Sequence, residues 1–472
     1  MSSFLASLIC AVGIAGLFWL DRDNSVRTSK ALWIPVLWLG IVGSRPVSTW
    51  MGFESTSGGY DQLLDGSPID RYIYELLLAA AIVVLLHRAS RTSAILRVNG
   101  AILLYFLYCL LSVSWSDYPD VSFKRWIKAI GDLAMILIVL TDAQPTAALQ
   151  RFLSRVGFVL LPMSVLFIKY FESGRGYDPA GMPMNTGVTT NKNTLGVITL
   201  VIALGKLWRV LQLLKDKGYP DRGRHLLAQG TLLAFGVAVL VLAHSATSLV
   251  CFALGSLLMV VTNLRSVQRR PAGVHVVVLT IFLAAGLAKL TGADAMVVQG
   301  LGRQTNFTGR TEIWSAVLTV PHNPIIGVGF ETFWLGPRLD EVWSHLSEYM
   351  HVNEAHNGYL EMYLNLGWIG VGLIAVLLIT GYLGAVTLFR RDPLVGSLAL
   401  AYIAASAVYS VTEAGFRMLL PIWMFLLLAV SAARAGVLHD RQFPLRIDQP
   451  DEAVRKLKLT RASRAGQPAK IA

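Results

Sequence analysis

Apolar runs long enough to cross a lipid bilayer recur from one end of this 472-residue chain to the other. A spanning helix needs about 17 to 25 largely apolar residues, because its backbone polar groups must be satisfied within the segment. The hydrophobic share of 54% and the charged share of 15% are typical of a membrane protein and not of a soluble domain. Strands that alternate apolar and polar residues are absent from the sequence. The chain is therefore predicted to be an all-α polytopic membrane protein.

The apolar runs predict about twelve to thirteen transmembrane helices and one large loop that contains short helices. The candidate spans are 3–20, 31–44, 71–87, 97–114, 126–141, 152–169, 193–213, 225–244, 247–263, 273–290, 357–389, 394–412 and 417–433. The predicted regions are N-terminal membrane helices (1–290), a large outer loop (291–356), C-terminal membrane helices (357–433) and a basic tail (434–472).

The distribution of charge orients these spans. The formal net charge is +12, and the cations gather in short loops between spans and in the tail. Cytoplasmic loops carry such an excess of lysine and arginine, so these loops and the tail are predicted to be cytoplasmic and the large loop to lie on the opposite, outer face. Contact with membrane lipids explains the charge better than a nucleic-acid partner does. The three cysteines, Cys10, Cys109 and Cys251, lie in separate apolar runs without metal-ligand spacing, so no metal site is expected.

His356 lies where a polar segment runs into an apolar helix. Asn353 is a good N-cap residue, which would place His356 in the first helical turn. The positive end of the helix dipole disfavours imidazolium, so the sequence predicts a neutral ring able to act as a general base near pH 7. The alternative is a histidine that only caps or packs.

Two cations on the same predicted face are candidates for binding an anion. Arg310 lies in the large loop, and its planar guanidinium suits phosphate oxygens. An ordinary ion pair with Glu312 or Glu331 is an equal alternative on spacing alone. Lys192 lies at the start of a span, where a helix N-terminus also favours anions, although a snorkelling interface anchor is the simpler interpretation.

The residues around His356 form a pattern with a wider resemblance. His356 and Asn357 are followed nine residues later by Gly367 and Gly370, and TGRTEIW (308–314) precedes PIIGVGF in the large loop. In these motifs the chain resembles the bacterial O-antigen ligase and Wzy-type polysaccharide polymerase family, in particular its ExoQ-like exopolysaccharide branch. The similar multi-span plan covers most of the chain.

The resemblance implies a glycosyltransferase at the periplasmic face of the bacterial inner membrane. Proteins of this kind transfer an undecaprenyl-pyrophosphate-linked glycan to a sugar hydroxyl without a nucleotide, a cofactor or an obligatory metal. It implies that His356 activates the hydroxyl and that Arg310 binds pyrophosphate. Family ligases often carry a Ser-Arg pair where this chain reads HSATS (244–248), which leaves the second phosphate cation open. The predicted substrate-binding residues are Lys192, Asn193, Arg303, Asn357, Glu361 and Trp314.

The favoured function is polymerisation of lipid-linked oligosaccharide repeats into exopolysaccharide or O-antigen, by inverting transfer. One alternative is an O-antigen ligase that moves the glycan to lipid A core or another acceptor. An alternative of a different class is a transporter or flippase for a lipid-linked sugar, and a structural scaffold is a third. Chain-length regulator and export proteins are further expected partners.

Overall fold

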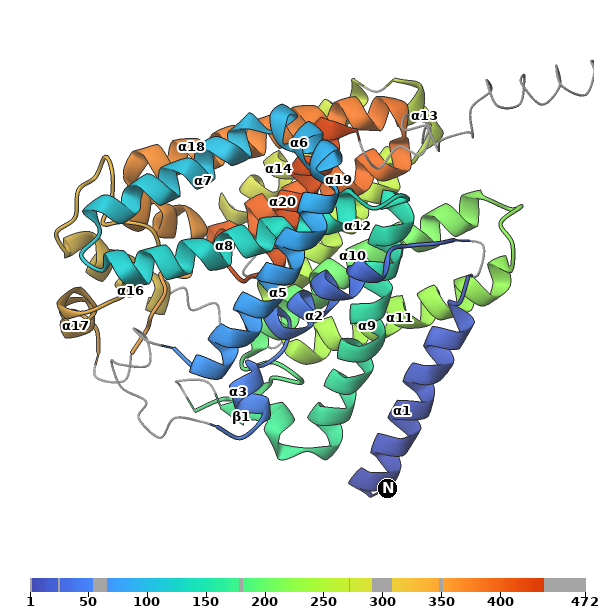
Figure 1. Cartoon of the computed structure of the whole chain (residues 1–472), viewed down its shortest axis with the longest axis horizontal. Helices are drawn as coiled ribbons and strands as arrows, with labels where there is room; N and C mark the ends of the chain where they lie inside the picture. Colours follow the sequence, from blue (N-terminus) through green and yellow to red (C-terminus); the bar gives the residue numbers. More distant parts are fainter. Residues whose placement is uncertain are drawn as a thin grey trace, which may run out of the picture.

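The computed structural model describes residues 2–23, 26–53, 66–177, 181–270, 272–290, 308–347 and 351–436. Within these ranges nearly all regular structure is helical (Figure 1). A small antiparallel hairpin is formed by β1 (Arg175–Tyr177) and β2 (Pro183–Asn185), with Arg175 opposite Asn185. The predicted all-α polytopic architecture is confirmed.

The helices follow the chain in two halves. The first half comprises α1 (Ser3–Leu20), η1 (Lys30–Leu32), α2 (Trp33–Val42), α3 (Val47–Trp50), α5 (Pro68–His87), α6 (Ala89–Val98), α7 (Gly100–Ser112), η2 (Val113–Trp115), α8 (Pro119–Leu140), α9 (Pro145–Tyr170) and η3 (Glu172–Gly174). The second half comprises α10 (Lys192–Lys215), α11 (Arg222–Ala243), α12 (Ala246–Thr262), α13 (Arg265–Arg269), α14 (Gly273–Leu290), α16 (Thr308–Thr319), α17 (Pro337–Ser344), α18 (Gly358–Arg391), α19 (Pro393–Thr412) and α20 (Pro421–Ala435).

Six of the described helices, α1, α9, α10, α11, α18 and α19, are long and apolar enough to cross a membrane. The pair formed by α6 and α7 with η2 bends by 90° and would make a seventh span. This number is smaller than the expected twelve to thirteen because α5 and α8 carry several charged residues and because α2, α12 and α20 are short. The number of spans therefore stays a prediction.

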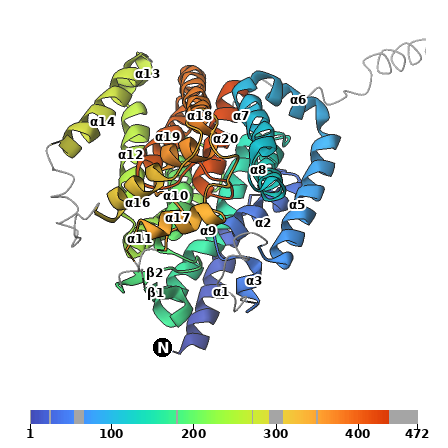
Figure 2. The same ribbon diagram turned by 90° about the vertical axis from the view of Figure 1, so that its left-hand side faces the viewer.

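The centre of the bundle is formed by α10, α19 and α20, with α12 and α14 on one side and α5 and α6 on the other (Figure 2). In the most apolar 18-residue window of each helix, 78% of the α19 window is buried but only 11% of the α1 window. Apolar side chains of α1 such as Phe4, which is 78% exposed, point outward. An apolar outer face is what a lipid-facing helix requires.

A second, smaller core lies at the end of the bundle where α16 and α17 sit (Figure 1). The loop between these two helices packs directly against a break in α18 at Gly367. A Cβ at Gly367 would lie 2.1 Å from the Ile325 carbonyl oxygen, and one at Gly327 would lie 2.3 Å from the Asn365 carbonyl carbon. Both glycines also have positive φ, at 65° and 68°. Two glycines therefore let the loop and the helix backbone touch.

Candidate functional site

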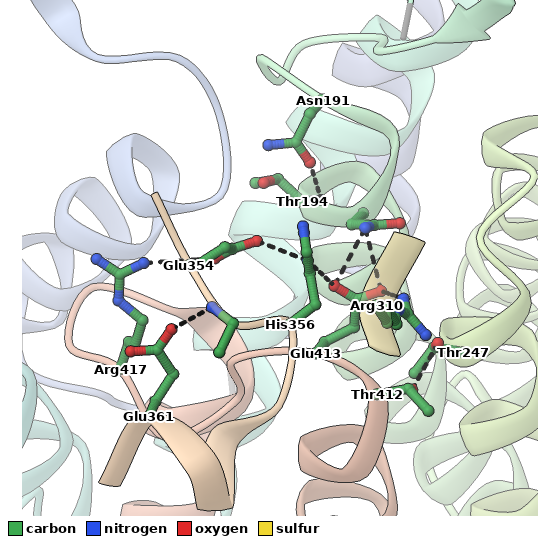
Figure 3. Close-up of polar contacts among 12 residues, drawn as sticks. Asn191, Thr194, Thr247, Arg310, Glu354, His356, Glu361, Thr412, Glu413 and Arg417 are labelled. Carbon is green, nitrogen blue, oxygen red and sulfur yellow. Dashed lines mark hydrogen bonds and ion pairs between the residues drawn. The ribbon is translucent and has the colours of Figure 1, made fainter. Parts of the chain in front are cut away.

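A row of charged side chains lies where this smaller core meets the helix bundle. His356 stands between Glu354 and Glu413, with Arg417 beyond Glu354 and Arg310 beyond Glu413 (Figure 3). Three segments contribute these groups: α16, the residues that precede α18, and the connection from α19 to α20. Basic and acidic side chains alternate along this row, from Arg417 to Arg310.

The imidazole of His356 is fixed through one nitrogen. Its Nδ1 lies 3.0 Å from Glu354 Oε1 and 3.3 Å from Glu413 Oε2. The second ring nitrogen points away from both carboxylates, toward the side where Asn191 and Thr194 are drawn (Figure 3). The side chain is 27% exposed. A ring held in this way presents one nitrogen to an incoming group.

Glu413 joins the largest number of partners in the site. Besides His356, its carboxylate accepts hydrogen bonds from Arg310 Nη2 at 2.8 Å and from Asn193 Nδ2 at 3.1 Å to each oxygen. Its side chain is 5% exposed, whereas that of Arg310 is 26% exposed. Asn193 in turn lies 3.5 Å from Ser245 Oγ, in the HSATS segment. Arg310 thus pairs with Glu413, a partner that spacing in the sequence did not suggest. Asn193 helps to position the Glu413 carboxylate.

Arg417 extends the row on the other side of His356. Its Nε lies 3.2 Å from Glu331 Oε2 and its Nη1 lies 3.3 Å from Glu354 Oε2. Sequence reasoning missed both Glu413 and Arg417, because they lie in a short link between two apolar helices. A glutamate and an arginine in a link of eight residues, 413–420, were the available signal.

The carboxylates determine the protonation of His356. Burial lowers the pKa of the imidazole, but hydrogen bonds to Glu354 and Glu413 and their charges outweigh burial and raise the pKa to about 10. Burial likewise raises the pKa of Glu354, but His356 and Arg417 outweigh it and lower the pKa to about 2. The neutral ring expected from the helix dipole is therefore wrong for the unliganded protein.

The position of His356 relative to its helix also differs from the expectation. The N-cap of α18 is Asn357, whose side chain accepts hydrogen bonds from the backbone of Tyr359 and Leu360, and not Asn353. His356 therefore precedes the helix and has a φ of 47°, in the left-handed region. A non-glycine residue held there needs support from its surroundings.

That support comes from the peptide groups of Ala355. Its N–H donates to Glu361 Oε1 at 2.5 Å, and its carbonyl accepts from Trp314 Nε1 at 2.8 Å. Glu361 is 1% exposed and also accepts from Trp334 Nε1 at 3.0 Å. Substrate binding by Glu361, Trp314 and Asn357 stays a prediction. In the structure Glu361 and Trp314 hold the turn that carries His356, and Asn357 caps α18.

Replacing Trp314 with phenylalanine should reduce the catalytic rate about tenfold, the effect of losing one part-buried hydrogen bond that positions the histidine turn. KM should change less than kcat. Trp343→Phe is the matched control, because Trp343 Nε1 donates at 2.8 Å to Val352 O, outside that turn. Equal losses in both variants would contradict the positioning role.

The remaining predicted residues have different outcomes. Lys192 is the first residue of α10, and the Asn191 side chain caps that helix through a hydrogen bond from Thr194 N at 2.8 Å. Lys192 therefore lies at the same end of α10 as Asn193, which contacts Glu413. Arg303 lies outside the described residues.

Glu354, His356 and Glu413 also have a spacing that could hold a metal ion, with ligand atoms all within 4.8 Å of one another. However, each carboxylate already faces a guanidinium, Arg417 or Arg310. A divalent cation here would lie beside two permanent positive charges. The donor set therefore suits proton transfer and anion binding better than a resident metal.

Comparison with known proteins bears on the same residues. Residues 231–375 match the family model described as "O-Antigen ligase", and this range includes Arg310, His356 and Gly367 but not Glu413 or Arg417. The chain is also similar to the exopolysaccharide production protein ExoQ of Rhizobium meliloti (strain 1021), with 24% identity over 299 residues. That match covers 59% of this chain and 63% of the relative, less than two thirds of its length. The resemblance predicted from the motifs is confirmed.

Proposed function

We propose that this chain, an ExoQ-like relative of the O-antigen ligase family, polymerises undecaprenyl-pyrophosphate-linked oligosaccharide repeats at the periplasmic face of the inner membrane. The observation that supports this most is the fixed histidine between two carboxylates, with Arg310 at one end of the same row of charged side chains. A proton acceptor beside an anion-binding cation is what transfer from a pyrophosphate donor requires.

The donor pyrophosphate binds Arg310, which is more exposed than its partner Glu413. Nη2 of Arg310 keeps its contact with Glu413, and the other N–H groups of the planar fork bind phosphate oxygens. Lys192 adds positive charge at the start of α10, where the helix N-terminus also favours an anion. The isoprenoid chain lies against the spans.

In the transfer step, the acceptor hydroxyl oxygen attacks the anomeric carbon while the bond between that carbon and the pyrophosphate oxygen breaks. The electron pair leaves with undecaprenyl pyrophosphate, whose charge is stabilised by Arg310. The hydroxyl proton passes to the free ring nitrogen of neutral His356, and the resulting imidazolium is stabilised by Glu354 and Glu413. A single displacement inverts the anomeric centre and needs no second carboxylate acid.

The raised pKa of His356 predicts a rate that increases with pH. Because the pKa is about 10, the fraction of neutral imidazole grows about tenfold for each pH unit between 7 and 9. We expect kcat/KM of the purified protein to follow this increase and to level off near pH 10, since kcat/KM reports the free enzyme. Glu354→Gln, which removes one carboxylate that raises the pKa, should shift the increase to lower pH.

A flat profile from pH 7 to 9 would contradict the base role. It would indicate instead that His356 acts in its protonated form, as a cation that stabilises the leaving group. Unfolding should be monitored at each pH so that loss of protein is separated from loss of chemistry.

Transfer should also proceed without a divalent metal. We expect the initial rate to change by less than about twofold in excess EDTA, because Arg310 and Arg417 already neutralise the carboxylates. Loss of activity that added Mg²⁺, Mn²⁺ or Ca²⁺ restores would contradict the metal-independent mechanism.

The ligase alternative is favoured by one observation, the description of the matching family as O-antigen ligase. A deletion strain distinguishes the candidates. Loss of long polymer with accumulation of lipid-linked repeats on the periplasmic face supports a polymerase. Long polymer that stays on its lipid carrier supports a ligase, and repeats trapped on the cytoplasmic face support a flippase. Chain-length regulator and export proteins would be needed alongside a polymerase.

A further inference from the structure

A second polar cluster lies further along α10, beyond the middle of the helix as seen from the histidine site. Asn193 contacts Glu413 near the start of this helix, and Lys206 lies thirteen residues further along. At a rise of 1.5 Å per residue this separates the two clusters by about 20 Å. The proposed transfer mechanism uses none of the residues in the second cluster.

The cluster is built around a buried lysine. Lys206 is 1% exposed, and its Nζ donates to Ser154 Oγ at 2.7 Å and to Gln229 Oε1 at 3.0 Å. Gln229 Nε2 donates to Asp21 Oδ1 at 2.6 Å, and His225 Nδ1 lies 3.2 Å from the same oxygen. The polar residues that end α1 are thereby tied to α9, α10 and α11.

Two adjoining cavities open beside this network. One has a volume of about 350 Å³ and the other about 430 Å³, and Arg22 and Asp23 line both. Ser154 and Asp21 line the first cavity, and His225 lines the second, so the buried network faces the cavities directly.

Each cavity is lined by an arginine that has one buried N–H without an acceptor. Within the part of the chain that the structure describes, Nη1 of Arg155 and Nε of Arg224 are buried and have no hydrogen-bond partner. Arg155 lies over the Trp33 ring at 4.3 Å and Arg224 over the Trp19 ring at 5.2 Å. Aromatic contacts thus fix both guanidinium groups. A buried donor left unsatisfied destabilises the folded protein, so a ligand that reaches it and accepts a hydrogen bond would relieve that cost.

The carboxylates of the cavities are already engaged. Asp21 accepts from Gln229, and Asp23 Oδ2 accepts from Tyr219 OH at 3.0 Å. Asp221, which lines the second cavity, pairs with Arg224 itself, with its Oδ2 3.1 Å from Arg224 Nη1. The arginines that line the cavities therefore offer N–H donors on cations, which select an anion with several acceptor oxygens.

We propose that these adjoining cavities bind a phosphate group through Arg155 and Arg224. Two sources have this chemistry. The first is the headgroup of a phospholipid, which can reach the cavities because α1 beside them is largely exposed on its apolar face. The second is a free phosphate compound from the aqueous phase. The site is independent of the glycosyl-transfer function proposed above.

The test uses the purified full-length protein in a mild detergent. Native mass spectrometry measures retained phospholipid, and the unfolding midpoint is titrated with inorganic phosphate against chloride at matched ionic strength. Retained phospholipid identifies the headgroup source, and saturable stabilisation by phosphate in delipidated protein identifies the free source. Arg155→Gln and Arg224→Gln should each weaken binding by about tenfold or more, the loss expected for one charge-assisted hydrogen bond.

The control is Arg97→Gln, which removes an exposed arginine of α6 that lines neither cavity. It should leave both measurements unchanged. If Arg155→Gln does not fold, Arg155→Lys and Arg224→Gln still test the site. The proposal is overturned if phosphate has no saturable effect and no phospholipid is retained, or if retention is the same in the two variants as in the wild type.

Discussion

Replacing His356 with glutamine or alanine is expected to reduce glycosyl transfer by about 10²–10⁴-fold, the usual contribution of a positioned general base. The loss should appear in kcat more than in KM, because proton transfer occurs only in the transition state. Lipid-linked repeats should accumulate in cells while long polymer disappears.

The fold should survive this change. His356 is 27% exposed, and the turn that carries it is held through the Ala355 backbone by Glu361 and Trp314. His345→Ala, at an exposed histidine in the α17 region of the same loop, is the matched control and should keep full activity. Normal polymer length from a verified, membrane-inserted His356 variant would eliminate the base role.

Replacing Arg310 with lysine should have the second largest effect, a loss of about 10²–10³-fold in kcat/KM, comparable to removing one donor that stabilises developing charge. Lysine keeps the charge but lacks the rigid planar fork, so it does not fix Glu413 and a phosphate oxygen in the same defined geometry. The contact of 2.8 Å between Arg310 Nη2 and Glu413 Oε1 orients the guanidinium group.

Arg338→Lys is the matched control for Arg310. Arg338 belongs to the same outer region and pairs with Asp117 at 2.6 Å, away from the histidine site. Its replacement should change transfer by less than about twofold, as is usual for an ion pair with an exposed partner. Equal behaviour of the two variants would show that Arg310 serves only as an ordinary ion-pair partner.

The membrane architecture could be predicted from the sequence because hydropathy acts locally. Each span reports its own length and composition, and the long apolar runs of α1, α9 and α10 were found at nearly their observed places. The number of spans was harder to predict. Whether a charged helix such as α8 or a short one such as α20 crosses the bilayer depends on its neighbours.

The site was only partly accessible to the same reasoning. His356 and Arg310 were found because they lie in motifs, but their shared partner Glu413 is 57 residues beyond His356 in the sequence. The protonation of the imidazole was predicted wrongly because the helix dipole was the only charge that the sequence placed nearby. Two carboxylates at hydrogen-bonding distance outweigh that dipole, and only the tertiary structure brings them there.

Glu361 and Trp314 illustrate the same limit. Both were predicted to bind substrate, but polar atoms near a site can face the substrate or the backbone. The structure directs both to Ala355. A sequence pattern gives the neighbourhood of a side chain and not its direction.

The central claim is tested most directly by incubating the purified protein with an undecaprenyl-pyrophosphate oligosaccharide and sizing the lipid-linked products. The account predicts a ladder of products that differ by one repeat, formed by the wild type and absent with the His356→Gln variant. Unchanged substrate from folded wild-type protein, or a single addition to a different lipid, would contradict polymerisation.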